Sequence, residues 1–412
     1  MNYLQFALEN RRFLAFGGLL TLSSSFGQTF FISLFSERIR AEFALSHGDF
    51  GTLYSLATLA SAASLIWVGR KIDDVDLRLY TLLICCAVIG ASFFMAAAPS
   101  VGGLFFAVFA LRISGQGLMG HTAATSMARY FDKQRGKAMS VVSLGYPLGE
   151  ASLPLIAVSL MSAIGWRQTW VVIGVVLSLT LAPLALWLLK GHKERHRRHV
   201  EKTNAPKPSA GPAQRQWTRR EVLRDPRFFL ILPNALAAPF ILTGFFFNQV
   251  HLAATKGWSL TWLATCFIGY AAAVIVASLF SGPLVDRVGA ARLLPFYLLP
   301  MVLGLGVLAV SAHPGAALFY MTAAGLSTGA SHTILGAMWA EIYGIAHLGA
   351  IRALTSALMV FSTSLSPAAM GLLIDYGVTM EAIAMGAVGF ILISIVLVKA
   401  AKLSPLPSEV RG

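Results

Sequence analysis

Long apolar runs recur along the whole chain and limit its fold more than any other feature of the sequence. Each run is about 20 residues long, the length that an α-helix needs to cross the hydrocarbon core of a bilayer. The chain is 56% hydrophobic and only 12% charged, unlike an ordinary soluble domain. The runs therefore predict an all-α membrane protein with twelve transmembrane helices. The predicted spans are 13–35, 49–69, 79–98, 101–128, 137–162, 168–190, 227–252, 260–284, 292–312, 315–340, 350–374 and 379–400.

The positions of lysine and arginine give the predicted orientation. Basic residues concentrate on the cytoplasmic side of membrane proteins. With both termini in the cytoplasm, the cytoplasmic side of this chain holds 27 of its 32 Lys and Arg residues. The outer loops hold Arg38, Arg40, Arg167 and Lys256, and Arg112 lies within a span. The charges thus predict a multi-pass protein of the cell (plasma or inner) membrane with both ends inside.

Two stretches of the chain match each other at a constant offset of 213 residues. The matched residues are Tyr130 and Tyr343, Gly136 and Gly349, Pro154 and Pro367, Gly69 and Gly282, and Asp73 and Asp286. Chance identities would not keep one register over about 85 residues, so the match indicates that a six-span unit was duplicated. We therefore expect two pseudo-symmetric six-helix bundles, at 1–190 and 227–412, joined by a basic cytoplasmic linker at 191–226.

The sequence lacks the features of an enzyme or of a nucleic-acid-binding protein. Its net charge is +14, but segment 190–227 alone holds 12 basic and 4 acidic residues, a composition typical of a solvated tether beside an anionic membrane surface. Cys85, Cys86 and Cys266 lie in apolar spans and offer neither a disulfide framework nor metal-ligand spacing. We find no phosphate loop, so we expect no catalytic site, no metal and no cofactor.

Four motifs resemble signatures of the major facilitator superfamily. Residues 282–289, Gly-Pro-Leu-Val-Asp-Arg-Val-Gly, are similar to its cytoplasmic signature, and the first-half counterpart keeps Gly69 and Asp73 but not the Arg and Gly that follow. Segment 112–117, Arg-Ile-Ser-Gly-Gln-Gly, looks like the family's fourth-span arginine motif. Segment 128–139 is similar to bacterial members near the monocarboxylate and oxalate porters. The resemblance covers essentially the whole chain and implies a transporter that works by alternating access.

The resemblance also implies a gating role for the cytoplasmic motif. In the family the signature aspartate, here Asp286, latches the outward-facing state through helix dipoles and basic residues of the neighbouring bundle. The alternative is that Asp286 and Arg287 only mark a turn and anchor the topology. The residues assigned to the gating motif are Gly69, Asp73, Gly282, Asp286, Arg287, Gly289, Arg135 and Gly136.

Two charged residues at membrane depth, Arg112 and Glu150, are the main site candidates. An arginine at mid-helix costs about 3 kcal/mol on insertion scales, so it is expected to be paired or functional. Each residue lies about 18 to 20 residues from the turn near 132–133, and at 1.5 Å per residue they reach similar depths. A pair between them has three interpretations: a structural ion pair, an anion site in which Arg112 binds substrate and Glu150 orients it, or a proton site on Glu150 that Arg112 tunes.

Polar residues in other spans are weaker candidates for the same cavity. Tyr146 shares a helical face with Glu150. Gln28 could equally form a packed inter-helix hydrogen bond, and His332 could equally be a satisfied core histidine. The full set of predicted cavity residues is Arg112, Glu150, Tyr146, Gln28, Asn248, His332, Ser362 and Ser366.

These observations predict a monomeric secondary active transporter that carries a small solute. The arginine within a span favours a small organic anion such as a carboxylate. Without a nucleotide-hydrolysing domain, uphill transport must use an ion gradient, and we expect protons as the coupling ion of a symporter or antiporter. Two alternatives stay open, proton-coupled export of drug-like or amphipathic compounds and a non-transporting membrane sensor. The expected partners are the solute, protons and membrane lipids, and no nucleic acid.

Overall fold

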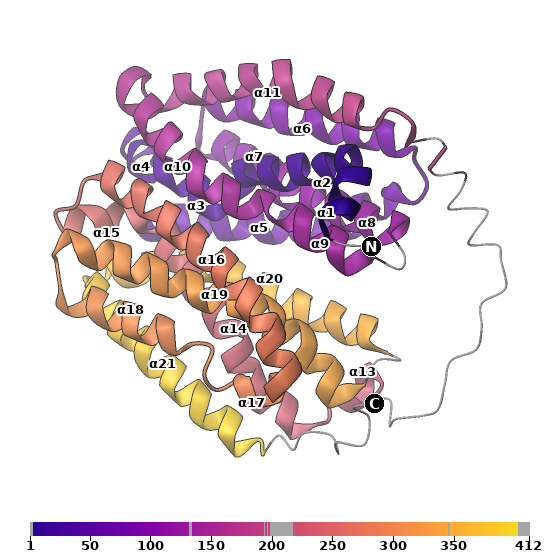
Figure 1. Cartoon of the computed structure of the whole chain (residues 1–412). Coiled ribbons are helices and arrows are strands. Elements are labelled where there is room, and N and C mark those ends of the chain that lie inside the picture. Colours follow the sequence, from indigo (N-terminus) through magenta and orange to yellow (C-terminus); the bar gives the residue numbers. More distant parts are fainter. Residues whose placement is uncertain are drawn as a thin grey trace, which may run out of the picture. The chain divides into compact units, whose positions relative to one another are not determined.

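The computed structural model describes residues 3–131, 134–192, 194–195, 197, 217–344 and 347–402. Every regular element in these residues is helical, which confirms the predicted all-α fold class (Figure 1). The helices form two compact units. Unit 1 comprises residues 1–45 and 53–210, and unit 2 comprises residues 46–52 and 211–412. Most of the linker expected at 191–226 lies outside the described residues.

Unit 1 contains both uninterrupted helices and spans assembled from shorter elements. Its elements in chain order are α1 (Tyr3–Glu9), α2 (Arg11–Ser23), η1 (Ser24–Gly27), α3 (Thr29–Ile32), η2 (Ser33–Phe35), α4 (Ser36–Phe43), α5 (His47–Val68, whose first residues belong to unit 2), η3 (Gly69–Ile72), α6 (Leu77–Ala97), α7 (Val101–Leu111), η4 (Arg112–Met119), α8 (Gly120–Tyr130), α9 (Arg135–Ser143), α10 (Gly145–Ile164) and α11 (Trp166–Leu188).

Unit 2 is built mainly from long helices. Its elements are α13 (Arg219–Val222), α14 (Pro226–Phe247), α15 (Gln249–Thr255), α16 (Leu260–Val288), α17 (Ala290–Leu293), α18 (Leu299–Val310), α19 (Pro314–Tyr343), α20 (Leu348–Asp375) and α21 (Met380–Ala400).

The number of helices that can span a membrane is close to the prediction. Among the described residues, nine helices are long and apolar enough to cross, and the bent pair formed by 11–27 and 29–43 makes a tenth. These helices confirm a multi-pass membrane protein. The count of twelve and the N-in, C-in orientation stay predictions.

Two predicted spans account for the difference in number. The span predicted at 292–312 is shorter than expected, because α18 has only 12 residues. Pro295 lies in the turn before α18, and proline removes a backbone donor and obstructs a continuous helix. The other is α19, which has 30 residues but carries Thr328, Ser331 and His332 in its middle, where they lower its apolarity.

Local sequence defines where many of these helices begin and end. The side chains of Asp76, Ser100 and Ser259 accept hydrogen bonds from backbone N–H groups in the first turns of α6, α7 and α16. Asp225 caps α14 in the same way. Such caps satisfy donors that have no partner within the helix. Gly289 ends α16 with φ +94°, a backbone conformation that favours glycine.

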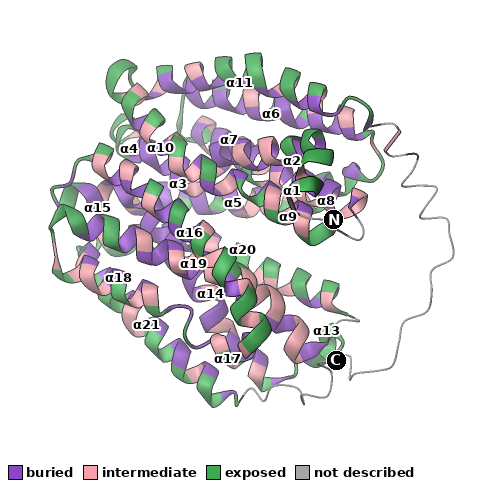
Figure 2. Ribbon diagram, viewed as in Figure 1, coloured by how far each residue is buried: buried purple, intermediate pink, exposed green. Residues whose placement is uncertain are grey.

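The outer faces of the helices are apolar and exposed. Figure 2 shows exposed residues along the outward edge of α11 and buried residues along the edge that faces α6. On this helix Leu179 is 73% exposed while Leu181, two residues later, is 1% exposed. Phe280 on α16 and Ile393 on α21 are likewise 75% and 62% exposed. Large apolar side chains in such positions are unfavourable in water but suit a helix that faces lipid.

The tyrosines of the 213-residue repeat occupy corresponding places in the two units. Tyr130 is the last residue of α8 and packs edge-on against Phe13 near the start of α2, with 5.6 Å between ring centroids. Tyr343 is the last residue of α19 and packs edge-on against Trp217, shortly before α14, at 5.4 Å. Each tyrosine thus ends a helix of its unit and packs edge-on against an aromatic ring from the N-terminal part of that unit, an arrangement that agrees with the predicted duplication.

Candidate functional site

The first span of unit 1 is interrupted in its middle. The 3₁₀ segment η1 covers Ser24–Gly27, and Gln28 has an extended backbone, with φ −87° and ψ 156°, before the helix resumes at Thr29. The flanking parts, 11–27 and 29–43, differ in direction by 46°. A break at membrane depth leaves backbone groups that other parts of the protein, or water, must satisfy.

The fourth span is irregular where it meets this break. It is π-helical over Arg112–Met119, and this segment packs on η1. A Cβ atom at Gly27 would lie 2.2 Å from the carbonyl oxygen of Leu111, and one at Gly115 would lie 2.8 Å from the backbone nitrogen of Gly27. Glycine at both positions therefore lets the two backbones touch. Short π-helical segments inside α-helices are rare and frequently occur at functional sites.

Arg112 is buried at this crossing, with 6% of its surface exposed. Its Nη1 donates a hydrogen bond to the carbonyl oxygen of Gly27 at 3.2 Å, and its Cζ lies 5.2 Å from the ring centroid of Tyr54. The Tyr54 hydroxyl donates to Oγ1 of Thr29 at 3.0 Å. Among the described residues, the Nε of Arg112 has no hydrogen-bond partner and no carboxylate forms an ion pair with the guanidinium. The positive charge is thus only partly compensated, which suits an anion.

Small polar side chains of span one lie beside the break. The Ser24 hydroxyl donates to the carbonyl oxygen of Thr21 at 2.7 Å, and Nε2 of Gln28 donates to Oγ of Ser24 at 3.2 Å. The Ser25 hydroxyl is buried and has no partner among the described residues. A buried polar group left unpaired costs about 1–3 kcal/mol, so Ser25 offers a hydrogen-bonding group to a ligand or to water.

The fifth span brings Glu150 and Tyr146 to the same region of unit 1. A Cβ atom at Gly149 on α10 would lie 2.2 Å from Oγ of Ser25, so α10 packs closely on the broken part of span one. Glu150, the next residue, is partly buried. The Tyr146 hydroxyl lies 2.9 Å from the position that a Cβ atom of Gly120 would take, which places it against the start of α8.

Arg112 and Glu150 do not form an ion pair, although the sequence predicts that they lie at similar depths. Both are described, and neither has an ion-pair partner within the described part of the chain. The helical rise fixes depth but not the direction in which a side chain points. The π-helical segment and the break at Gly27 direct Arg112 towards span one and Tyr54 instead. The structural ion-pair interpretation is therefore wrong for this structure, and anion binding at Arg112 and proton binding at Glu150 stay predictions for each residue by itself.

The four predicted cavity residues of unit 2 lie in different surroundings. Asn248 is buried at the end of α14, where its Nδ2 donates to a backbone carbonyl oxygen one turn earlier at 3.0 Å. Ser366 on α20 donates to the carbonyl oxygen of Phe240 on α14 at 2.6 Å. His332 on α19 is exposed, and Ser362 on α20 lines an apolar pocket. Asn248 and Ser366 thus have structural partners within their own unit.

In unit 1 the Gly-x3-Asp motif is held by residues of span four. Asp73 forms an ion pair with Arg129, near the end of α8. The carbonyl oxygen of Gly69 lies 3.1 Å from Nε2 of His121 on the same helix. The loop that follows α5 is therefore attached to α8 at two points.

In unit 2 the corresponding loop is held differently. Glu341, near the end of α19, accepts a hydrogen bond from the backbone N–H of Ala290 at 2.8 Å, directly after Gly289. The acidic group thus lies on the helix in unit 2 and in the loop in unit 1. Asp286 and Arg287, in the last turns of α16, are exposed and form no ion pair with another described residue.

The remaining motif residues make few contacts. Arg135 donates to a backbone carbonyl oxygen near the end of α8 at 3.2 Å. Gly136 and Gly282 have open space where a Cβ atom would lie, so neither is required by close packing.

Sequence reasoning missed three residues that complete these sites, namely Tyr54, Ser25 and Arg129. Arg129 immediately precedes Tyr130 of the repeat and lies within the family-like segment 128–139, so the sequence carries a signal for it. Ser25 and Tyr54 had none, because each is one of many polar or aromatic residues in the spans and its contact depends on how the helices bend.

Comparison with known proteins agrees with this architecture. A family model described as Major Facilitator Superfamily matches residues 17–269, more than half of the chain. One similar solved structure is a bacterial homolog of the human lysosomal transporter Spinster in an inward-facing and occupied conformation, with a TM-score of 0.68 and 16% identity over 96% of each chain. Another is such a homolog in an inward-facing and unoccupied conformation, with a TM-score of 0.64 and 15% identity over 95% of each chain. At this identity the likeness shows the fold alone. A search of the curated proteins finds no match.

Proposed function

The chain belongs to the Major Facilitator Superfamily, and on that premise we propose that it is a secondary active transporter of a small organic anion, such as a carboxylate. It is a multi-pass membrane transporter and not an enzyme. In the proposal, a monomer in the cell membrane exposes the substrate site to either side in turn, and a proton gradient drives the cycle.

The surroundings of Arg112 are the observation on which the proposal rests. A buried guanidinium normally has an acidic partner, because an uncompensated charge at membrane depth is costly. Arg112 instead contacts a backbone carbonyl and an aromatic ring, and its Nε has no partner in the described part of the chain. A carboxylate of the substrate would supply the missing negative charge and accept a charge-assisted hydrogen bond. The unpaired Ser25 hydroxyl lies on the span-one segment against which Arg112 packs and offers a further contact.

Proton coupling is assigned to Glu150. This carboxylate is partly buried on α10, next to the glycine that packs on Ser25, and has no cationic partner among the described residues. Acidic residues in such positions within transporters serve as proton relays. Protonation of Glu150 would remove a negative charge from the vicinity of the anion site and so favour anion binding.

Uptake of mono- and dicarboxylates into proteoliposomes tests the anion site. We expect Arg112→Gln to reduce uptake about tenfold or more, as the loss of a charge-assisted hydrogen bond implies. The matched control is Arg38→Gln, which removes an exposed arginine that has no ion-pair partner among the described residues. Uptake at the wild-type level by Arg112→Gln, with both variants equally well folded, would refute the anion site.

A second variant tests the coupling ion in the same vesicles. We expect Glu150→Gln to keep the exchange of labelled anion between the two sides and to lose the accumulation driven by a pH gradient. Undiminished pH-driven accumulation in Glu150→Gln would show that the proton is carried elsewhere. If no carboxylate is moved and amphipathic compounds are, the export alternative is correct.

A further inference from the structure

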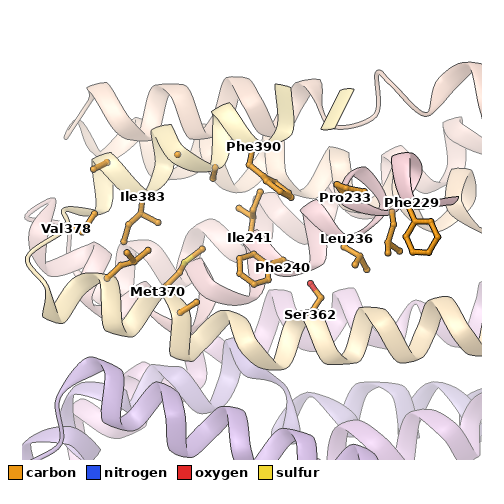
Figure 3. Close-up of a pocket in the computed structure, with 16 residues that line it drawn as sticks. Phe229, Pro233, Leu236, Phe240, Ile241, Ser362, Met370, Val378, Ile383 and Phe390 are labelled. Atoms are coloured by element: carbon orange, nitrogen blue, oxygen red, sulfur yellow. The ribbon is translucent and has the colours of Figure 1, made fainter. Parts of the chain in front are cut away.

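Unit 2 contains an apolar pocket between α14, α20 and α21 (Figure 3). Its volume is about 670 Å³. Ile241 and Met370 lie in its wall and are buried, while Phe229 and Phe390 are 53% and 44% exposed. Of the lining residues, all of which are described, Ser362 alone has a polar side chain. The pocket is therefore a hydrocarbon-lined groove that is open along part of its length.

Neither water nor empty space is a stable filling for this groove. Protein interiors contain few voids larger than a water molecule, because a void removes van der Waals contacts from its lining. An ordered water needs two to four polar partners, and the lining provides only the Ser362 hydroxyl. An apolar molecule is the filling that satisfies both conditions.

The shape of the groove matches an extended chain rather than a compact solute. On α14 the lining runs from Phe229 to Ile241, and twelve residues of helix extend about 18 Å. On α21 it runs from Ala382 to Phe390, about 12 Å, and Val378 lines it from the turn before this helix. The groove is thus about 18 Å long where it follows α14. This is more than half of the hydrocarbon thickness of about 30 Å. All three helices are long and apolar enough to span a membrane. The apolar molecule that a membrane makes available to the groove is therefore a lipid acyl chain.

The charges at the two ends of the groove indicate which lipid head group fits. The end at which α14 begins and α21 finishes carries Arg224 and Lys399, both exposed and without an ion-pair partner among the described residues. The other end carries the acidic Asp375 and Glu381, and Glu381 is already paired with Lys256 at 2.8 Å. An anionic head group is favoured beside the unpaired cations and disfavoured beside the carboxylates.

We propose that this groove binds one acyl chain of an anionic phospholipid, with the head group beside Arg224 and Lys399. The site lies wholly within unit 2 and uses neither Arg112 nor Glu150, so it is independent of the proposed transport activity. Bound lipid would fill the space between α20 and α21 and stabilise their packing on α14.

Two glycines of α21 provide a matched test. Gly386 lines the groove and Gly389 does not, and both have open space where a Cβ atom would lie. Gly386→Phe therefore fills the groove, whereas Gly389→Phe adds the same side chain to the same helix outside it. Delipidated full-length protein in detergent is titrated with phosphatidylglycerol or with phosphatidylcholine of the same chains. Bound lipid is counted by native mass spectrometry, and the melting temperature is recorded.

We expect one tightly retained phosphatidylglycerol, with a rise in melting temperature, in wild type and in Gly389→Phe, and loss of both effects in Gly386→Phe. Ala369→Phe fills the groove from α20 and should act like Gly386→Phe if the latter does not fold. The double variant Arg224→Gln, Lys399→Gln should lose the preference for phosphatidylglycerol over phosphatidylcholine. Equal lipid retention in the filled and control variants would overturn the acyl-chain site. Equal retention of the two lipids by wild type would overturn the assignment of the head group.

Discussion

Two glycines, Gly27 and Gly115, determine how closely spans one and four approach each other. A Cβ atom at Gly27 would lie 2.2 Å from the carbonyl oxygen of Leu111, a backbone atom that cannot rotate away. We expect Gly27→Ala to destabilise the protein by about 1–3 kcal/mol, the usual effect of overpacking. Gly18→Ala in α2 is the control, because no atom lies within 4 Å of its added Cβ. Thermal unfolding in detergent should show a lower midpoint for the first variant only, and equal midpoints would contradict the contact.

Asp225 makes the stability of unit 2 depend on pH. Burial alone would raise the pKa of this carboxyl, but hydrogen bonds from the side chain and the backbone of Arg227 outweigh it and hold the pKa below its usual value. A carboxyl with a lowered pKa in the folded state stabilises the fold above its unfolded pKa of about 3.9 and loses this effect as the pH falls through the folded value.

The prediction for Asp225→Asn follows from the lowered pKa of Asp225 in the folded state. The variant should melt at a lower temperature than wild type, with a constant difference between pH 7 and about pH 5 and a shrinking one below about pH 4. Asp286→Asn serves as the control, since Asp286 is exposed and forms no ion pair with another described residue. A difference that grows towards acid pH would contradict the assignment.

The residue that mattered most could be identified from the sequence, but its contacts could not. Arg112 is conspicuous as a basic residue within an apolar span, and a buried charge is informative without any structure. Its contacts with Gly27 and Tyr54 depend on the break in span one and the π-helical segment in span four. No residue pattern predicts the angle at which two irregular segments cross. Depth alone predicts Glu150 as its partner, and depth does not fix the direction of a side chain.

At the scale of helices, α14 and α20 are joined by a hydrogen bond from a serine that the sequence assigned to substrate binding. Ser366 is fully buried and donates to the carbonyl oxygen of Phe240 on the neighbouring helix at 2.6 Å. Ser364 is equally buried but donates to the carbonyl oxygen of Phe361, on its own helix, at 2.7 Å. The two serines thus differ in whether their hydrogen bond connects two helices.

Alanine substitutions at the two positions measure that difference. We expect Ser366→Ala to lower the free energy of unfolding by about 0.5–1.5 kcal/mol, the typical net contribution of one hydrogen bond. Ser364→Ala should cost less, because only a contact within a single helix is lost. Chemical denaturation followed by tryptophan fluorescence gives both values. A larger loss of unfolding free energy for Ser364→Ala would show that the inter-helix hydrogen bond contributes little. Loss of transport without loss of stability in Ser366→Ala would show that Ser366 belongs to the substrate site.

Helices were easier to predict than their interruptions. Apolar length located the long helices because the bilayer imposes a minimum length on any span. The interruptions at Gln28 and at Arg112–Met119 lie inside stretches that are apolar enough overall to be predicted as continuous spans, so hydropathy averaged over a span does not reveal them. Proline is the exception, because Pro295 in the turn before α18 indicates in the sequence that the helix is shorter.

At the scale of the whole molecule, the two units correspond in architecture more than in chemistry. Tyr130 and Tyr343 retain corresponding packing in the two units. The loops after α5 and α16 are each attached to the helix that follows later in the same unit, at its C-terminal end. The acidic group lies in the loop in unit 1 and on the helix in unit 2. In unit 1 an aspartate of the loop pairs with Arg129, whereas in unit 2 Glu341 on the helix accepts from the loop backbone. The first copy of the signature motif is thus degenerate in sequence, while its loop is still attached to the end of the fourth span.

The orientation in the membrane is a prediction for the whole chain that single residues can test. Basic residues on the predicted cytoplasmic side outnumber those on the outer side, and this imbalance sets topology during insertion. Arg38 and Arg70 are both exposed, and the prediction places Arg38 outside and Arg70 inside. Cysteine is introduced at one or the other in a background with Cys85, Cys86 and Cys266 replaced by alanine. A membrane-impermeant maleimide should label Arg38→Cys in intact cells and Arg70→Cys only after the membrane is permeabilised. The reverse pattern would invert the topology and would place the basic end of the lipid groove at the outer leaflet.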